Sequence, residues 1–222
     1  MGEFMNKNIL ITILCIIFSI ITGIITNDIL LGSTILATGL LTAYFASIGK
    51  KCNYIFGFIN YLLMAYISLK NNLYGMAIFY TFVFAPLQIK GFISWNKELN
   101  NNKSVNIRKF TLKNSVIITI SCILGSIILG YILNLIPNEQ LSLLDATSNC
   151  INLCGVILMI LRFREAWWVW LANNIADLTI WIILTINNGP NSIMMLLVSI
   201  GYFLLNIYGL IKWNIESKKL IK

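Results

Sequence analysis

The sequence contains no histidine, and only eight of its 222 residues are acidic. The chain therefore lacks the side chain that most often serves as a general base or a metal ligand near neutral pH. Charged residues make up 11% of the chain, whereas ordinary soluble domains carry roughly 25%. The sequence also shows no P-loop, no nucleophile with a neighbouring base and no cluster of metal ligands. We therefore expect a protein that is not an enzyme and that uses neither a cofactor nor a metal ion.

Apolar residues fill most of the chain, at 58% of the total, and give a mean hydropathy of +0.82. They gather in stretches close to the roughly 20 residues that a helix needs to cross the hydrocarbon core of a bilayer. Backbone polar groups find no water there, so such stretches are expected to be helical. The sequence predicts an all-α polytopic membrane protein with eight transmembrane helices: 9–25, 29–48, 53–69, 73–95, 115–136, 143–161, 166–186 and 192–213.

The N-terminal residues need separate treatment. Residues 1–5 resemble a vector-derived leader ahead of a second start methionine, so we assign 1–8 to a tag and an N-terminal tail. We expect residues 9–26 to form an accessory transmembrane helix. A signal peptide is the alternative, but only Lys7 precedes this stretch and no small-x-small cleavage site follows it. The five cysteines lie in or beside apolar stretches, as small buried side chains do.

Basic residues are distributed unevenly over the predicted loops. If eight helices alternate across the bilayer, fourteen of the sixteen Lys and Arg residues lie on one side, Lys70 lies on the other and Lys90 lies within the fourth helix. This asymmetry follows the positive-inside rule and places both termini and the loop 96–114 in the cytoplasm. The net charge of +8 is therefore explained by membrane topology, without nucleic-acid binding.

Two segments of the chain resemble each other. The segment that begins at Lys50 lies 113 residues before the one that begins at Phe163, which sets Asn60 against Asn173. Towards the end of the unit the shift is 118. It matches Gln88, Gly91 and Trp95 with Asn206, Gly209 and Trp213. Any two apolar segments align to some degree, but matched glycine, tryptophan and amide positions favour a true repeat.

The repeat predicts two parallel three-helix bundles. The first comprises residues 27–95 and the second 138–213, with a cytoplasmic loop at 96–114, a linker helix at 115–137 and a tail at 214–222. Parallel repeats about an axis along the membrane normal are a known plan for transporters, with the substrate near the bilayer midplane between the repeats.

Polar side chains within the apolar stretches indicate where a substrate would bind, because such groups are costly in hydrocarbon. Trp167, Trp170 and Asn174 stand at i, i+3 and i+7 and share one helical face. Trp offers a flat ring with one donor, and Asn offers a donor and an acceptor. Together they suit an aromatic ligand that must be held in one orientation. We assign Trp168 and Trp181 instead to ordinary membrane packing.

Other helices add amide and aromatic candidates. Phe84 precedes Gln88 by one turn, as Tyr202 precedes Asn206, so each half sets an aromatic ring one turn before an amide. Asn60 is a further candidate, and Asn149 and Asn152 extend the same predicted lining. Pro86 is expected to kink the fourth helix.

Four polar residues keep other interpretations open. Asn173 is either a ligand contact or a hydrogen bond between helices. Asp177 either attracts a cationic substrate, carries a coupling proton or pairs with an amide while protonated. Lys90 is expected to snorkel towards the cytoplasmic surface. Asp145 is expected to favour the positive end of the helix that it begins.

The stretches NYIFGFIN (from Asn53), PLQIKGFISW (ending at Trp95) and WWVWLANN (from Trp167) resemble the Pnu family of vitamin transporters. The resemblance runs from the second to the eighth predicted helix, and its most specific part is the pattern W-x-x-W-x-x-x-N. In that family the pattern lines the substrate site together with an amide at the position of Gln88. The chain departs from the family at Lys90, where an uncharged residue is expected.

The resemblance implies a SWEET-like fold in the bacterial inner membrane, often assembled as a homotrimer. It also implies facilitated diffusion without ion or ATP coupling, with the vitamin trapped in the cell by a kinase. Nicotinamide riboside is the substrate that we predict. Thiamine, riboflavin and deoxynucleosides are the alternatives within the family. An ion-coupled carrier, which rests on Asp177 alone, and a structural membrane subunit are the alternatives from other classes.

Overall fold

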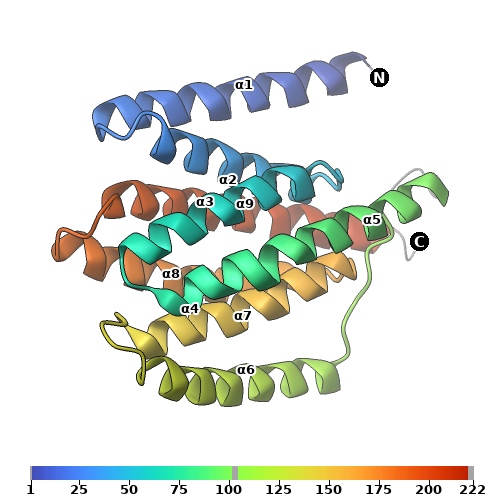
Figure 1. Ribbon diagram of the computed structural model, residues 1–222. Helices are drawn as coiled ribbons and strands as arrows, with labels where there is room; N and C mark the ends of the chain where they lie inside the picture. Colours follow the sequence, from blue (N-terminus) through green and yellow to red (C-terminus); the bar gives the residue numbers. More distant parts are fainter. Residues whose placement is uncertain (1, 102–104, 220–222) are drawn as a thin grey trace.

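The computed structural model describes residues 2–101 and 105–219, and these residues form long helices joined by loops (Figure 1). Within them the structure contains no β-strand, only an isolated bridge between Arg108 and Phe163. The all-helical architecture predicted from the apolar stretches is therefore confirmed.

The helices follow one another with few long connections. They are α1 (Gly2–Ile25), α2 (Leu31–Ser47), α3 (Asn53–Lys70), α4 (Tyr74–Phe79), the π-helix η1 (Tyr80–Phe84), α5 (Ala85–Asn101), α6 (Leu112–Leu133), α7 (Ser142–Ile160), α8 (Ala166–Ile186) and α9 (Ser192–Lys219). Because α4, η1 and α5 continue without a break, they form one long helix. The described residues thus contain the eight long helices that the sequence predicts.

Six of these eight helices are long and apolar enough to cross a membrane: α1, the α4–η1–α5 helix, α6, α7, α8 and α9. The 17 residues of α2 are at the short end of what spans a bilayer. The chain is a multi-pass membrane protein.

Three helices extend past their predicted bounds. Helix α1 begins at Gly2 and not at residue 9, so most of the predicted tail 1–8 is helical. Helix α5 continues to Asn101 and α9 to Lys219, past the predicted ends at 95 and 213, so parts of the predicted loop 96–114 and of the predicted tail 214–222 are helical. The apolar pattern stops at the predicted ends, but a helix outside the hydrocarbon needs no apolar residues. Its backbone is hydrated, and residues such as Lys and Glu favour the helix.

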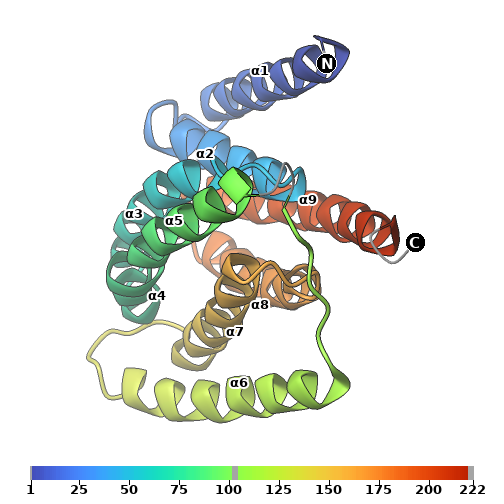
Figure 2. The same cartoon turned by 90° about the vertical axis from the view of Figure 1, so that its right-hand side faces the viewer.

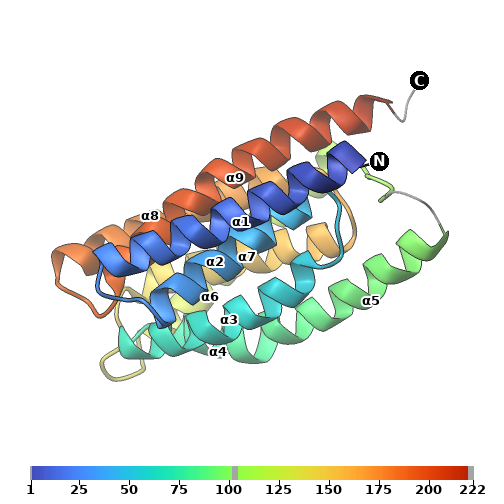
Figure 3. The ribbon, with the colours of Figure 1, turned by 90° about the horizontal axis from the view of Figure 1, so that it is seen from above.

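The helices form a ring with two additions. Helices α2, α3, α4–α5, α7, α8 and α9 surround a common centre, and α2 packs against α9 to close the ring. Viewed nearly along the helices, α1 and α6 lie at opposite outer edges, against α2 and α7 (Figure 2). Helix α1 begins and α9 ends at the same end of the bundle (Figure 3).

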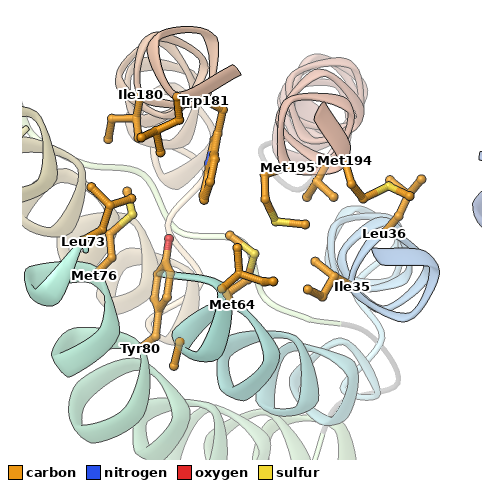
Figure 4. Packing of buried hydrophobic residues seen from close by; sticks show 14 of the residues in the cluster. Ile35, Leu36, Met64, Leu73, Met76, Tyr80, Ile180, Trp181, Met194 and Met195 are labelled. Atoms are coloured by element: carbon orange, nitrogen blue, oxygen red, sulfur yellow. The ribbon is translucent and has the colours of Figure 1, made fainter. Parts of the chain in front are cut away.

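The distortion expected at Pro86 takes the form of a π-helical turn. A proline has no N–H to donate and its ring crowds the carbonyl one turn earlier. The wider turn η1 lies immediately before the first turn of α5, which contains Pro86. Its residues Tyr80 and Phe84 are both buried. Figure 4 shows Tyr80, Trp181 and Met64 converging from three helices on the centre of the bundle.

Two tryptophans that the sequence pairs make reciprocal hydrogen bonds. The Nε1 of Trp95 in α5 donates to the carbonyl oxygen of Met159 near the end of α7, at 3.2 Å. The Nε1 of Trp213 in α9 donates to the carbonyl oxygen of Ser47 at the end of α2, at 3.1 Å. The two indole rings stack with centroids 6.2 Å apart. The last helix of each half is thereby bonded to the first helix of the other.

The paired glycines Gly91 and Gly209 also make equivalent contacts. Gly91 lies against the ring of Tyr54 and Gly209 against the ring of Trp167, so closely that a Cβ at either position would overlap the ring. The shift of 113 that pairs Asn60 with Asn173 also pairs Tyr54 with Trp167. The two halves therefore have matching contacts at this end of the bundle.

The reciprocal bonds predict equal effects from two substitutions. Trp95→Phe and Trp213→Phe each keep an aromatic ring and remove one buried N–H donor, which is expected to cost about 0.5–1.5 kcal/mol. Each should lower the thermal unfolding midpoint of the detergent-purified protein. Trp168→Phe is the matched control, because Trp168 is 60% exposed. Unchanged midpoints for both Trp95→Phe and Trp213→Phe would contradict a role for these bonds.

Candidate functional site

A cavity of about 80 Å³ lies inside the ring of helices. By the same measure one water needs roughly 10–15 Å³, so the cavity has room for several waters or a flat organic ring. Both halves of the chain contribute to it. The lining residues are Thr42, Ala43, Ala46, Gly57, Asn60, Tyr61, Met64, Tyr80, Asn152, Trp170, Asn173, Asn174, Asp177, Trp181, Val198, Ser199, Tyr202 and Asn206.

The structure brings seven of the ten predicted site residues to this cavity: Asn60, Trp170, Asn173, Asn174, Asp177, Tyr202 and Asn206. Four of them come from α8, where each of the adjacent residues Asn173 and Asn174 is three or four positions from both Trp170 and Asp177, so all four lie on one broad face. The other predicted residues, Trp167, Gln88 and Phe84, are buried outside the lining.

Trp167 lies behind Trp170. Its side chain is fully buried, and its ring meets that of Trp170 edge to face with centroids 5.4 Å apart. The ring of Trp167 also meets that of Trp213 edge to face, with centroids 5.7 Å apart. Trp167 therefore fixes the position of Trp170 and does not itself face the cavity.

Phe84 and Gln88 also lie behind lining residues. The ring of Phe84 packs against Tyr61 and Tyr80, with centroids 5.2 and 5.7 Å apart. The side-chain carbonyl of Gln88 lies directly over Gly57, which lines the cavity. A bulkier residue than glycine at position 57 would displace the Gln88 amide.

Asn60 ties three helices together beside the cavity. Its amide nitrogen donates to the carbonyl oxygen of Ile35 at 2.8 Å and to the hydroxyl of Thr38 at 3.0 Å, both in α2. Its side-chain oxygen accepts a hydrogen bond from the hydroxyl of Tyr202 in α9, at 2.9 Å. Both donors of the Asn60 amide are used within the protein, so a ligand meets this residue chiefly through its carbonyl oxygen.

Asn173 and Asp177 form a hydrogen-bonded pair one turn apart on α8. The Asn173 amide nitrogen donates to one oxygen of the Asp177 carboxylate at 2.8 Å. The hydroxyl of Ser148, which is buried in α7, donates to the other oxygen at 2.5 Å. The bond from Asn173 to Asp177 lies within α8, but the Ser148 hydroxyl of α7 also lies 3.4 Å from the Asn173 side-chain oxygen, which accepts from it. Of the two interpretations of Asn173, the structure therefore contains the hydrogen bond between helices, although the residue also lines the cavity.

Asn174 differs from these residues because its amide nitrogen is unpaired. The side chain is 3% exposed, lines the cavity, and has no partner for Nδ2 among the described residues. A buried donor without an acceptor is costly and uncommon in folded proteins. An acceptor on a bound ligand would satisfy it.

Sequence reasoning missed three aromatic residues of the lining, Tyr61, Tyr80 and Trp181. The assignment of Trp181 to membrane packing is wrong, since its side chain is 1% exposed and faces the cavity. Its spacing of seven residues from Asn174 was the available signal. Tyr61 is the repeat partner of Asn174, which was another signal. Nothing in the sequence pattern indicated Tyr80, because the π-helical turn that positions it has no simple period.

The amino-acid sequence of the chain is similar to those of known transporters. A family model described as "Nicotinamide mononucleotide transporter" matches residues 29–215. The nicotinamide riboside transporter PnuC of Neisseria mucosa is 31% identical over 201 residues, which are 88% of this chain and 74% of that protein. PnuC of Haemophilus influenzae is 27% identical over 188 residues, 83% of this chain and 77% of that protein.

A solved structure is also similar. The crystal structure of the vitamin B3 transporter PnuC superimposes with a TM-score of 0.81 at 27% sequence identity, covering 94% of this chain and 90% of that one. The likeness extends over nearly the whole chain.

Gly155 controls how closely Trp170 approaches α7. A Cβ at position 155 would overlap the indole of Trp170. Gly155→Ala is therefore expected to destabilise the protein by about 1–3 kcal/mol, as overpacking does. Thermal unfolding checks this, and Trp170→Phe in the same chain should recover part of the loss because a phenyl ring is smaller. A double variant no more stable than Gly155→Ala alone would show that the ring contact is not the cause.

Proposed function

This chain belongs to the nicotinamide mononucleotide transporter family, and we propose on that basis that it carries nicotinamide riboside across the membrane through the central cavity. The protein is a transporter and not an enzyme. The observation that carries the choice of site is the position of Trp170 and Asn174. These residues belong to the most specific pattern of the family, and both face one cavity between the two halves of the chain.

The lining suits a ligand with an aromatic ring and several hydrogen-bonding groups. Trp170, Trp181, Tyr61 and Tyr80 supply flat faces for a pyridine ring. A cationic ring gains further from contact with Trp faces. The free amide nitrogen of Asn174 is available to the carboxamide oxygen or a ribose hydroxyl. The remaining polar partners at the same cavity are Asn206, Tyr202 and Asn60. The lining is supported from behind by Trp167, Gln88 and Phe84, which are buried.

The charge of the lining favours a nucleoside over a nucleotide. None of the described lining residues is Lys or Arg, and Asp177 carries the formal negative charge. A phosphate group would enter this cavity without a basic partner and near a carboxylate, which is strongly unfavourable away from water. The riboside named for the relatives fits the lining better than the mononucleotide in the description of the family model.

The proposal extends to membrane topology and mechanism. Helices α2–α5 and α7–α9 are taken as two three-helix bundles in a SWEET-like arrangement, with α6 as linker and α1 as accessory helix. The excess of basic residues on one side supports cytoplasmic termini in a bacterial inner membrane. Rocking of the two bundles about the cavity would give alternating access. A homotrimer is the assembly expected from the family resemblance.

The substrate is tested with purified protein and a ligand panel. Nicotinamide riboside is expected to bind in isothermal titration calorimetry more tightly than thiamine, riboflavin or deoxynucleosides. Asn174→Ala should weaken that binding about three- to tenfold, the equivalent of one hydrogen bond. Asn114→Ala is the matched control, because Asn114 is exposed on α6. Binding of thiamine alone would replace the substrate within the same family, and unchanged affinity in Asn174→Ala would refute the assigned site.

Facilitated diffusion is tested in proteoliposomes. With the membrane potential held at zero, uptake of the cationic riboside is expected to stop when the internal and external concentrations are equal, and an imposed proton gradient should not alter that end point. A coupled carrier would instead accumulate substrate when the gradient is imposed. Loss of such accumulation in Asp177→Asn would assign the coupling proton to Asp177 and overturn the proposal of simple facilitated diffusion.

A further inference from the structure

Asp177 gives the cavity a negative charge, and it forms no ion pair with a basic side chain in the part of the chain that the structure describes. Among the described lining residues it is the one side chain that carries a formal charge at neutral pH. A carboxylate away from water is costly unless other groups stabilise it. Because of this cost, a carboxylate at the cavity indicates that the ligand itself stabilises the charge.

The carboxylate is held in place by uncharged donors only. Ser148 donates to one oxygen at 2.5 Å and Asn173 donates to the other at 2.8 Å. An ionised carboxylate acts purely as an acceptor, so donors on both oxygens suit the charged group. Neither donor neutralises the charge. The carboxylate can therefore attract a positively charged ligand in the cavity, and this attraction is strong because the distance is short and little water screens it.

The charge belongs to one half of the cavity. The shift of 113 pairs Asp177 with Met64, which also lines the cavity but is apolar. Asn173 and Asn174 lie on the same side as Asp177, whereas Tyr61 and Tyr80 come from the other half. A ligand whose positive charge is spread over an aromatic ring would contact aromatic side chains of both halves, including Trp170 on the same helix as Asp177, and still lie near the carboxylate.

We propose that Asp177, positioned by Ser148 and Asn173, makes the cavity select the oxidised, cationic form of the nicotinamide ring over its reduced, neutral dihydro form. This inference rests on the proposed function and adds to it the property by which the site discriminates. Asp177 is the specificity-determining residue. Ser148 is a positioning residue, because it lies outside the lining and acts through the carboxylate.

The oxidised and reduced ribosides make a sharp pair of probes, because they differ by one hydride and by the charge of the ring. Both are titrated by calorimetry into the purified wild-type protein, Asp177→Asn and Ser148→Ala. The wild type is expected to bind the oxidised form at least about tenfold more tightly. Asp177→Asn should bring the ratio close to one, chiefly by weakening the oxidised form. Ser148→Ala should lower the ratio partway.

Matched controls separate charge selection from a general loss of structure. Ser126→Ala removes a buried hydroxyl from α6, and Asp28→Asn removes a carboxylate from the loop between α1 and α2. Both are expected to keep the wild-type ratio. Retained binding of the dihydro form shows that the Asp177→Asn protein is folded. If that variant does not fold, the affinity ratio of Ser148→Ala still tests charge selection by the carboxylate.

The outcomes distinguish this inference from the proposed function. Equal affinities of the wild type for the two forms would overturn charge selection while leaving the transported vitamin as proposed. An unchanged ratio in both Asp177→Asn and Ser148→Ala would overturn the role of these residues. If neither form binds to the wild type, the proposed function fails and this inference fails with it.

Discussion

A polar group inside a bilayer must find its partner within the protein, and this constraint explains most of the central region. Asn60 bonds to α2 and accepts a bond from α9, while Asp177 accepts bonds from α7 and from its own helix. Each of these bonds ties neighbouring helices or fixes a side chain at the cavity. Asn174 breaks the pattern, because its amide nitrogen is buried and unpaired among the described residues. We propose that an acceptor on the bound ligand satisfies this donor.

The two halves of the chain match at one end of the bundle and differ at its centre. At the end, Trp95 and Trp213 make reciprocal bonds, and Tyr54 and Trp167 rest on paired glycines. At the cavity, the shift of 113 places Tyr61 opposite Asn174 and Met64 opposite Asp177. Equivalent positions thus have unlike chemistry: among the described lining residues the carboxylate is on α8 alone, although aromatic rings and amides line the cavity from both halves. Such an asymmetric lining suits the asymmetric ligand that we propose for it.

The sequence was sufficient to predict the helices and most of the α8 face, because length, hydropathy and a period of 3.6 residues depend on local composition. The sequence was insufficient where the depth of packing decides which residues of one helical face reach the cavity. Trp167 and Trp170 share a face, yet only Trp170 reaches the cavity, since Trp213 and Gly209 hold Trp167 one layer back. Trp181 was assigned to membrane packing because the sequence does not show how deeply its side chain is buried. Tyr80 depends on a π-helical turn before Pro86, which no periodic pattern marks.

The asymmetry of the cavity has a consequence for transport by rocking bundles. Tyr61 and Tyr80 come from α3 and η1, whereas Trp170, Asn174 and Asp177 come from α8, so a ligand that fills the cavity contacts both halves at once. Separation of the halves on either side must break one of these two sets of contacts. Hydrogen bonds between the halves lie at both ends of the bundle. The two tryptophan bonds lie at one end, and at the other end the Asn71 amide donates to the carbonyl oxygen of Pro190 at 2.9 Å and the backbone N–H of Tyr74 donates to the carboxylate of Glu139 at 2.7 Å. Opening at either end therefore breaks hydrogen bonds of the protein as well as one set of ligand contacts.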